Sequence, residues 1–382
     1  MIPSLCPDAC RARRETLRKQ VSSAHAGVDA LLVSRPEHVY YLTGFLHDPN
    51  NINNRAPQYL LIDADGGASL VIDGFGPNRP GLALMAENGI EVITGGWAAF
   101  DPLVPRTIAA ARAVAAELGR RGIGRLGAEP AHLPRAAADE DAVVVDVEPL
   151  ITRMRRRKDD DELAIIRAAI KVGERFHRAA RERIRAGISE VDLYAEVVAE
   201  ATKEAEQPLV MMCDFRSGPP MRTGLGPTGR IIEPGDNLLL DIYPYMKGYR
   251  CDITNTLNAG GRPTALQEKA MEAAIAGLNA CAEAGRPGVS GDDFYRIQTD
   301  AIAEYDPAWK QMQGHAGHSL GLEHPEAPDF RTGNSETITE GDVITFEPHV
   351  FGDPFQGCRI EHNYLVTADG LEQLSQHEIG LC

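Results

Sequence analysis

Short apolar runs and segments of helical periodicity alternate along the first part of the chain. The runs of strand length are residues 29–34, 58–63, 68–72, 90–93 and 143–146, and the helical segments are residues 11–26, 79–88 and 105–121. The second and third runs flank Asp65-Gly66-Gly67, which is typical of a tight turn, so they predict a β-hairpin. Because helices and strands are interleaved, this part is predicted to fold as an α/β domain.

The second part of the chain has two pairs of long helical segments, and each pair is followed by strand-like runs. The helical segments are residues 162–186, 190–206, 265–284 and 292–304. In the first of them the apolar residues recur at the spacing of one helix face: Leu163, Ile166, Ala169, Ile170 and Val172. The order of helices, strands, helices and strands predicts another unit of mixed α/β (α+β) structure.

The length of the chain indicates two domains. Its 382 residues exceed what a single hydrophobic core normally serves. We place the domains at residues 1–152 and 153–382. The charged run from Arg153 to Asp161 lies at this boundary, and we interpret it as a solvated surface segment.

The composition excludes several classes of partner. The net charge of -16 makes nucleic acid and anionic membrane surfaces poor partners, because phosphate binding needs clustered Lys and Arg. No window approaches 18 apolar residues and the N-terminus lacks an apolar signal region, so we expect no membrane partner and a cytoplasmic protein. The 7 cysteines are scattered and odd in number, and we interpret them as reduced.

Five residues in the second part have side chains that favour a metal site. They are Asp241, Asp252, His318, Glu347 and Glu361. Each lies beside a strand-like or glycine-punctuated segment, and the two aspartates flank a turn that brings neighbouring strands together. Four carboxylates and one imidazole fit a pair of divalent cations better than a single cation. Each acidic residue taken alone is more often a solvated cap, so the prediction depends on their combination.

The order Asp, Asp, His, Glu, Glu, with GHSLGLE, TFEP and RIE around the last three, resembles the M24 metallopeptidases. These include prolidases, aminopeptidase P, methionine aminopeptidases and the related creatinases. The gaps of 29 and 14 residues after His318 resemble the prolidase branch. The phrase from Tyr40 to Phe45 is similar to the N-terminal domain of creatinases and prolidases. The resemblance implies an N-terminal creatinase-like α/β domain, a C-terminal pita-bread catalytic domain and a homodimer.

The resemblance also implies a role for each ligand. Asp241 would bind a first ion, His318 and Glu347 a second, and Asp252 with Glu361 would bridge them. Among divalent metals, we expect these oxygen ligands and the one imidazole to bind Mn²⁺, with Co²⁺, Zn²⁺ or Fe²⁺ as alternatives.

Two such ions, about 3.5 to 4 Å apart, can hold a bridging water that attacks a small peptide or amide bond. Arg359 is expected to position Glu361 as a neighbouring cation.

The sequence departs from the prolidase pattern at two histidines that bind substrate and move protons in that family. Counting from the ligands places Gly224 and Pro325 at those positions, while His324 lies one residue early. We rank His324 first as general acid, provided that its ring reaches the leaving nitrogen. Further histidines near the ligands are His315, His349 and His362. Asn255 stands where the family often has arginine.

Three functions are therefore considered. The first is a dinuclear metallohydrolase of the Xaa-Pro dipeptidase or aminopeptidase type. The second is a non-peptidase use of the same pocket on a small metabolite, by C–N hydrolysis or a lyase reaction. The third is a binding module with weakened catalysis, for which the two missing histidines are the only argument.

Overall fold

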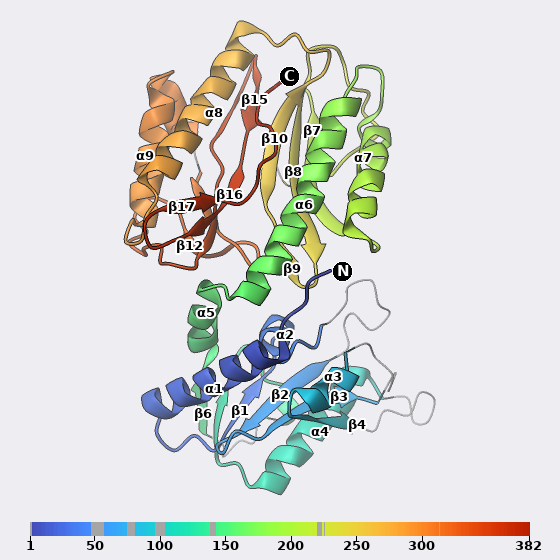
Figure 1. Cartoon of the computed structure of the whole chain (residues 1–382), viewed down its shortest axis with the longest axis vertical. Helices are drawn as coiled ribbons and strands as arrows, with labels where there is room; N and C mark the ends of the chain where they lie inside the picture. The colour runs from blue at the N-terminus through green and yellow to red at the C-terminus, as the bar shows by residue number, and fades with distance from the viewer. Residues whose placement is uncertain are drawn as a thin grey trace. The chain divides into compact units, whose positions relative to one another are not determined.

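The computed structural model describes residues 2–46, 57–74, 81–95, 104–137, 143–219, 224, 226–312 and 314–382. The chain divides into two compact units, Ser4–Arg155 and one that contains Arg156–Cys382. We describe each unit by itself (Figure 1). The expected boundary between residues 152 and 153 stays a prediction. No helix of the described residues is long and apolar enough to cross a membrane.

The N-terminal unit is built on one sheet with the strand order β4-β3-β2-β1-β5-β6. The strands are β1 (Ala30–Val33), β2 (Gln58–Asp63), β3 (Ala68–Asp73), β4 (Ile90–Gly95), β5 (Arg125–Ala128) and β6 (Val143–Asp146). The helices are α1 (Pro7–Ala24), α2 (Pro36–Thr43), α3 (Ala83–Glu87), α4 (Arg106–Arg121) and α5 (Glu148–Arg156), with a 3₁₀ turn at Arg135–Ala137. The predicted α/β class is confirmed.

The predicted hairpin is formed by β2 and β3, which pair antiparallel from Gln58 opposite Ile72 to Ile62 opposite Ala68. Gly66 in the turn has φ +100, a conformation that side chains with a Cβ rarely adopt. The helix predicted over residues 79–88 is shorter in the structure than expected: α3 covers Ala83–Glu87. Residues 79 and 80 lie outside the described residues.

The second unit consists of two halves, each with a pair of helices and a sheet. The first half has α6 (Asp160–Arg183), α7 (Glu190–Ala205), β7 (Val210–Ser217), β8 (Asn237–Met246), β9 (Tyr249–Arg250) and β10 (Ile253–Asn258). Its strands have the order β10-β8-β7, and β9 pairs with β8. Because α6 contacts α7 and packs on β8, the helical face predicted for residues 162–186 covers the sheet.

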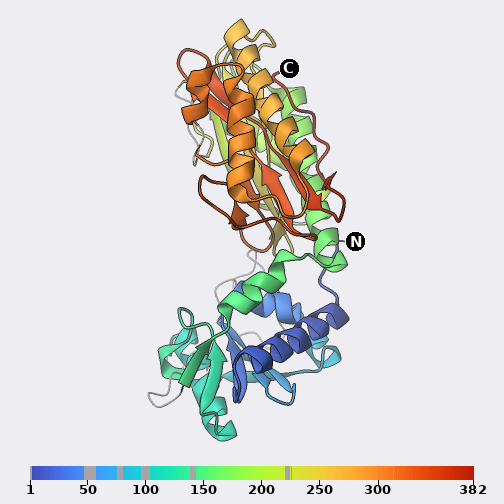
Figure 2. The ribbon, with the colours of Figure 1, turned by 90° about the vertical axis from the view of Figure 1, so that its left-hand side faces the viewer.

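The second half repeats this arrangement. It has α8 (Ala265–Ala284), α9 (Gly291–Ala303), a 3₁₀ segment (Pro307–Met312), β11 (Gly317–Ser319), β12 (Glu326–Asp329), β13 (Val343–Phe346), β14 (His349–Gly352), β15 (Gln356–Arg359), β16 (His362–Val366) and β17 (Leu371–Gln373). One sheet has the order β12-β11-β13-β16-β17, and β14 pairs with β15. The strands lie between the two helix pairs, with α8 and α9 in front in Figure 2.

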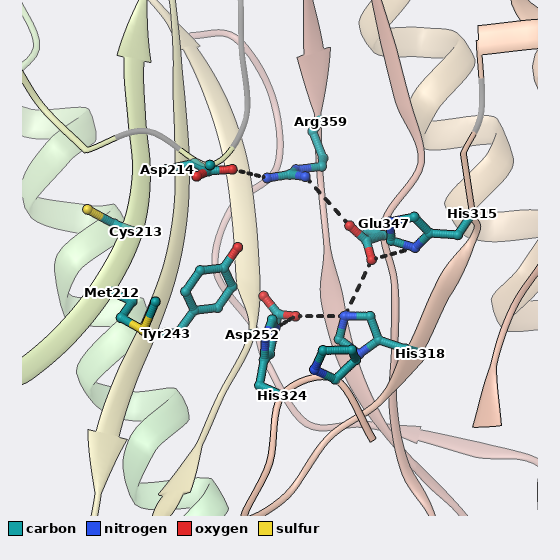
Figure 3. A pocket seen from close by; sticks show the side chains of 12 residues that line it. Met212, Cys213, Asp214, Tyr243, Asp252, His315, His318, His324, Glu347 and Arg359 are labelled. Atoms are coloured by element: carbon teal, nitrogen blue, oxygen red, sulfur yellow. Dashed lines mark hydrogen bonds and ion pairs between the residues drawn. The ribbon is translucent and has the colours of Figure 1, made fainter. Parts of the chain in front are cut away.

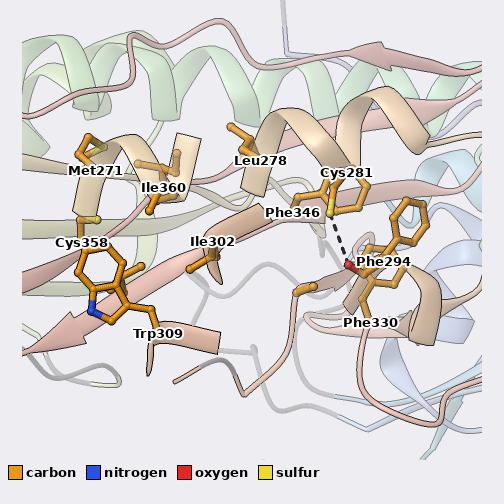
Figure 4. Close-up of a cluster of buried hydrophobic side chains, with 14 of the residues drawn as sticks. Met271, Leu278, Cys281, Phe294, Ile302, Trp309, Phe330, Phe346, Cys358 and Ile360 are labelled. Carbon is orange, nitrogen blue, oxygen red and sulfur yellow. Dashed lines mark hydrogen bonds between the residues drawn. The ribbon is translucent and has the colours of Figure 1, made fainter. Parts of the chain in front are cut away.

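The core of the second half is an apolar cluster beneath α8 and α9 (Figure 4). Phe294 on α9 packs against Phe330 and Phe346, with ring centroids 4.8 and 4.9 Å apart. Phe346 ends β13, so the last residue before Glu347 is anchored in the core. Burial of such rings contributes about 1.5 to 3 kcal/mol each, which fixes the strand end that carries a candidate ligand.

The interpretation of the charged run as a solvated segment holds only in part, since Arg153, Arg157, Asp159 and Asp160 are exposed but other residues of the run are buried. Arg155 is buried, and its Nη1 lies 2.8 Å from Nε2 of His38. Lys158 is buried as well and donates to Glu326 Oε2 at 3.0 Å. Asp159 forms a capping box with Glu162 at the start of α6. The charges therefore begin a helix and make internal ion pairs, which a charge count alone does not reveal.

Gly317 begins β11 beside the candidate ligand His318, and it provides a test of how closely β11 packs against β13. Its φ is +141, and a Cβ at this residue would lie 2.0 Å from the carbonyl oxygen of Thr345. We predict that Gly317→Ala lowers the free energy of unfolding by about 2 to 5 kcal/mol, because backbone strain and overpacking add. Urea unfolding of the metal-free protein measures this change.

Gly314→Ala is the matched control, since a Cβ there meets nothing within 4 Å. Equal midpoints for the two variants would show that β11 moves away from β13 at little cost.

Candidate metal centre

The structure brings the five predicted ligands together inside the second unit. Asp241 lies on β8, His318 on β11, Asp252 follows β9, Glu347 follows β13 and Glu361 follows β15. Their exposed fractions lie between 1% and 6%. Ligand atoms of Asp241, Asp252 and Glu361 lie within 4.8 Å of one another, and so do those of His318, Glu347 and Glu361. The two groups share Glu361.

Asp241 is held by donors on one oxygen. Oδ2 accepts the hydroxyl of Tyr243 at 2.6 Å and a close contact from Nη2 of Arg359. Oδ1 is buried and accepts no hydrogen bond from the described residues. A buried carboxylate oxygen without a donor is costly, so this atom is suited to a cation.

Asp252 is fixed through its backbone. Asn363 Nδ2 donates to the Asp252 carbonyl at 2.5 Å, and the Asp252 N–H donates to Asn363 Oδ1 at 3.1 Å. Burial, followed by the charges of Asp241 and Glu347, raises the pKa of Asp252 well above its usual value. Without a cation, therefore, the cluster favours a protonated Asp252.

The ring of His318 is oriented by its own strand. Nδ1 lies 2.9 Å from the carbonyl oxygen of Ser319, so Nδ1 carries the proton and donates. Nε2 then presents its lone pair toward Asp252 Oδ2 at 3.4 Å and Glu347 Oε1 at 3.5 Å. Burial lowers the pKa of His318 to about 4, so the ring is neutral near pH 7 and able to bind a metal.

Glu347 is the carboxylate that stays ionised. Its Oε1 lies 3.0 Å from Nδ1 of His315. Burial raises the pKa of Glu347, but the hydrogen bond from His315 and the nearby charges of His318 and Arg359 outweigh it and lower the pKa to about 2. His315, which the sequence showed only as a further histidine near the ligands, is thus the direct partner of a predicted ligand.

Two threonines hold Glu361. Thr254 Oγ1 donates to Oε2 at 2.7 Å, and Thr345 Oγ1 donates to Oε1 at 2.8 Å. Arg359 was expected to position Glu361, but its guanidinium donates to Asp214 and Asp241, and its Nη1 lies 3.7 Å from Glu347 Oε2. Burial raises the pKa of Glu361 while the charge of Arg359 lowers it, so the expected role of Arg359 beside Glu361 stays a prediction.

His324 enters the cluster although it lies one residue early by counting. Its Nε2 is 2.5 Å from Asp252 Oδ2, and its ring centroid is 4.4 Å from that of Tyr243. The ligand atoms of Asp252, His318 and His324 also lie within 4.8 Å of one another. Burial lowers the pKa of His324, so the ring is neutral near pH 7.

The remaining histidines and Asn255 have other surroundings. His349 Nδ1 lies 3.1 Å from the carbonyl oxygen of Glu347. His362 contacts Ser375 Oγ at 2.8 Å and packs against His377, with ring centroids 4.5 Å apart. Asn255 bonds to the backbone of Gly380, so it anchors the C-terminal segment. None of these three is among the described residues that line the pocket.

The pocket itself has a volume of about 390 Å³ (Figure 3). Its described lining residues are Met212, Cys213, Asp214, Gly224, Tyr243, Asp252, His315, His318, His324, Pro325, Glu347 and Arg359. Sequence reasoning missed Tyr243 and Thr254, which lie two residues after Asp241 and Asp252. Because strand side chains alternate, a period of two predicts the shared face in β8.

The residues present fit a metal centre. The ligand atoms are buried oxygens and one imidazole nitrogen, with Asp241 Oδ1 and Asp252 Oδ1 lacking hydrogen-bond donors among the described residues. Hard oxygen ligands suit Mn²⁺, Fe²⁺, Co²⁺ or Zn²⁺. The seven cysteines are free, as expected, and none belongs to these groups of described residues.

Comparison with known proteins extends this description. Residues 164–368 match the model of metallopeptidase family M24, and residues 13–157 match the creatinase/prolidase N-terminal domain. The chain is similar to an Xaa-Pro dipeptidase of Pyrococcus horikoshii, with 30% identity over 237 residues, which is 61% of this chain and 66% of that protein.

Solved structures show the same fold. An Xaa-Pro dipeptidase from Bacillus anthracis superposes with a TM-score of 0.80 at 22% identity, covering 97% of this chain and 99% of that chain. The prolidase from Pyrococcus horikoshii OT3 gives a TM-score of 0.79 at 24% identity, over 97% of this chain and 100% of that chain.

Arg359 provides a test of the electrostatics of this site. Its side chain is 9% exposed, and one guanidinium faces the carboxylates of Asp214, Asp241 and Glu347. We predict that Arg359→Met destabilises the metal-free protein at pH 7 by about 3 to 5 kcal/mol, because buried carboxylates lose their cation. Urea unfolding in the presence of a chelator measures this change.

Arg296→Met is the control. Arg296 also pairs with two carboxylates, but its side chain is 61% exposed, so its removal should cost less than about 1 kcal/mol. If both variants unfold at the same midpoint, the buried carboxylates do not depend on Arg359.

Proposed function

The chain belongs to metallopeptidase family M24. We therefore propose that it hydrolyses a small peptide or amide bond with the help of two divalent metal ions, and that Mn²⁺ is the preferred metal. Co²⁺, Zn²⁺ and Fe²⁺ are the alternatives that the same oxygen ligands accept. The observation that carries the proposal is the pair of overlapping buried ligand groups that share Glu361. The family resemblance also supports a homodimer in the cytoplasm, which sedimentation of the purified protein tests for the oligomer.

The overlap of the groups supports two ions rather than one. Asp241, Asp252 and Glu361 form one group, and His318, Glu347 and Glu361 form the other. A carboxylate common to two groups is suited to bridge two cations. When bound, such a pair supplies a nucleophile at neutral pH and stabilises negative charge on the amide oxygen.

The chain's own residues prepare this chemistry. The Ser319 carbonyl holds the proton of His318 on Nδ1, which leaves Nε2 free to bind. Thr254 and Thr345 fix the orientation of Glu361. These contacts preorganise the ligands, which commonly changes metal affinity by about 10- to 100-fold.

His324 is the proposed proton-transfer group. It lines the pocket, and its Nε2 shares a hydrogen bond of 2.5 Å with Asp252 Oδ2. This contact lets a proton pass between the carboxylate and the imidazole at the edge of the pocket. General acid catalysis by a positioned imidazole typically contributes about 10² to 10⁴ in rate.

The substrate is proposed to differ from an ordinary Xaa-Pro dipeptide. Gly224 and Pro325 line the pocket, and a Cβ at Gly224 would meet none of the described residues within 4 Å. The pocket therefore has glycine and proline where the prolidase pattern would place imidazoles. This observation also supports the second candidate function, a non-peptidase reaction on a small metabolite.

The proposed function makes a prediction about metal content. Wild-type protein reconstituted with Mn²⁺ should bind about two equivalents, and Asp252→Ala and Glu361→Ala should lose metal and activity together, because each removes a bridging carboxylate. Elemental analysis after gel filtration measures the stoichiometry. Asp342→Asn is the control, since Asp342 is buried and pairs with Arg156 away from the pocket. Fewer than about one equivalent in the wild type contradicts the dinuclear site.

The proposed function also makes a prediction about the proton-transfer group. We predict slow cleavage of Ala-Pro and Gly-Pro by the wild type, and a further loss of about 10² to 10⁴ on its best substrate in His324→Ala, with metal content unchanged. Initial rates and elemental analysis measure both effects, and His132→Ala, an exposed histidine of the other unit, is the control. A loss of metal in His324→Ala would instead make His324 a ligand. Rapid Ala-Pro cleavage that survives the substitution would exclude the role in proton transfer.

A further inference from the structure

Asp214 is a carboxylate of the pocket wall that the proposed metal centre does not use. It lies on β7 directly opposite Asp241 of β8, and the whole residue is 5% exposed. Asp214 does not belong to any of the ligand groups formed by the described residues. Directly paired strand residues project to the same face, so Asp214 lies beside the first candidate ligand without joining it.

Asp214 is hydrogen-bonded to Arg359 and to Gly224. Its Oδ2 accepts from Arg359 Nη2 at 2.9 Å, and the backbone N–H of Gly224 donates to its carboxylate. In Figure 3 its side chain lies across the pocket from Asp252, with Tyr243 between them. Asp214 and Gly224 both line the pocket of about 390 Å³, so part of this volume borders the carboxylate.

The charges around the pocket leave Asp214 as an acidic feature. The rings of His318 and His324 are already engaged, since His318 Nδ1 donates to the Ser319 carbonyl and His324 Nε2 lies 2.5 Å from Asp252 Oδ2. Among the described lining residues, Arg359 is the permanent cation, and His315 lies against Glu347. Arg359 is shared between three carboxylates. Apart from the proposed metal ions, the described residues of this wall offer a substrate anion no permanent cation but Arg359, whereas a substrate cation meets the Asp214 carboxylate.

We propose that Asp214 determines substrate specificity and selects small substrates that carry, besides the α-amino group, a positively charged, hydrogen-bond-donating group such as an ammonium or a guanidinium. This inference rests on the proposed hydrolase function and names the substrate class of the same site. The group enters the pocket beside Gly224 and donates to the Asp214 carboxylate. Charge-assisted hydrogen bonds of this kind are roughly twice as strong as neutral ones, so one such contact is sufficient to discriminate between substrates.

The test compares ligands that differ only in one cation. Binding of L-lysinamide and L-norleucinamide to the manganese-loaded protein is measured by calorimetry, and hydrolysis of Lys-Pro and norleucine-Pro is measured in parallel. We expect the wild type to favour the lysine member of each pair by about tenfold or more. Asp214→Asn keeps the shape of the side chain and removes its charge, and it should reduce the ratio to about one.

Asp236→Asn is the matched control. Asp236 is a buried carboxylate that pairs with Arg230 at 2.6 Å and is not among the described lining residues, so this variant should keep the wild-type ratio. Circular dichroism and metal analysis confirm that each variant is folded and loaded. If Asp214→Asn does not fold, the wild-type binding ratio decides alone.

The outcomes separate this inference from the proposed function. A wild-type binding ratio near one, or a ratio that survives in Asp214→Asn, overturns the role of Asp214 while hydrolysis can still stand. An equal loss of binding for both amides in a folded, loaded Asp214→Asn assigns Asp214 to holding Arg359 and also overturns it. A tenfold binding ratio that depends on Asp214, without hydrolysis of either dipeptide, supports the recognition site and counts against peptidase activity.

Discussion

The concentration of buried negative charge is the constraint on which the second unit depends. Asp241, Asp252, Glu347 and Glu361 are all nearly inaccessible to water, and Arg359 is the guanidinium that faces them. Moving an ionised carboxylate out of water costs several kcal/mol even after relaxation of the protein. Protons offset part of this cost, since burial raises the pKa of Asp252 and Glu361 well above their usual values. Divalent cations offset it more completely, and this is why the arrangement favours a metal centre.

The two-halved fold is what permits this concentration of charge. The ligands come from strands of both halves, and the apolar residues next to them anchor each strand in a core. Phe346 beside Glu347 is fully buried among aromatic rings, and Ile360 beside Glu361 belongs to the same cluster. A ligand that follows a well-packed apolar residue has little freedom to move away from its neighbours. The packed core therefore holds the carboxylates close together, although their negative charges repel one another.

The sequence predicted the ligand set but not its support. The ligand order and the helix pairs were visible because they are local patterns, and the helix predicted over residues 265–284 matches α8. Asp214 was missed because its relation to Asp241 depends on the pairing of β7 with β8, which a linear pattern does not contain. The buried part of the charged run was missed for the same reason, since Lys158 bonds to Glu326, which lies 168 residues away in the chain.

His324 shows why counting residues is a weak guide to a site. By counting, Pro325 occupies the expected position, yet the imidazole of His324 reaches Asp252 Oδ2 at 2.5 Å. His324 lies in the connection between β11 and β12, whose pairing is irregular: His318 is opposite Asp329, but Ser319 is opposite Glu326 instead of Pro328. An irregularity of this kind changes the course of the chain beside the candidate ligand. An imidazole acts from its place in space, so the role proposed for His324 depends on this contact with Asp252 and not on its number in the sequence.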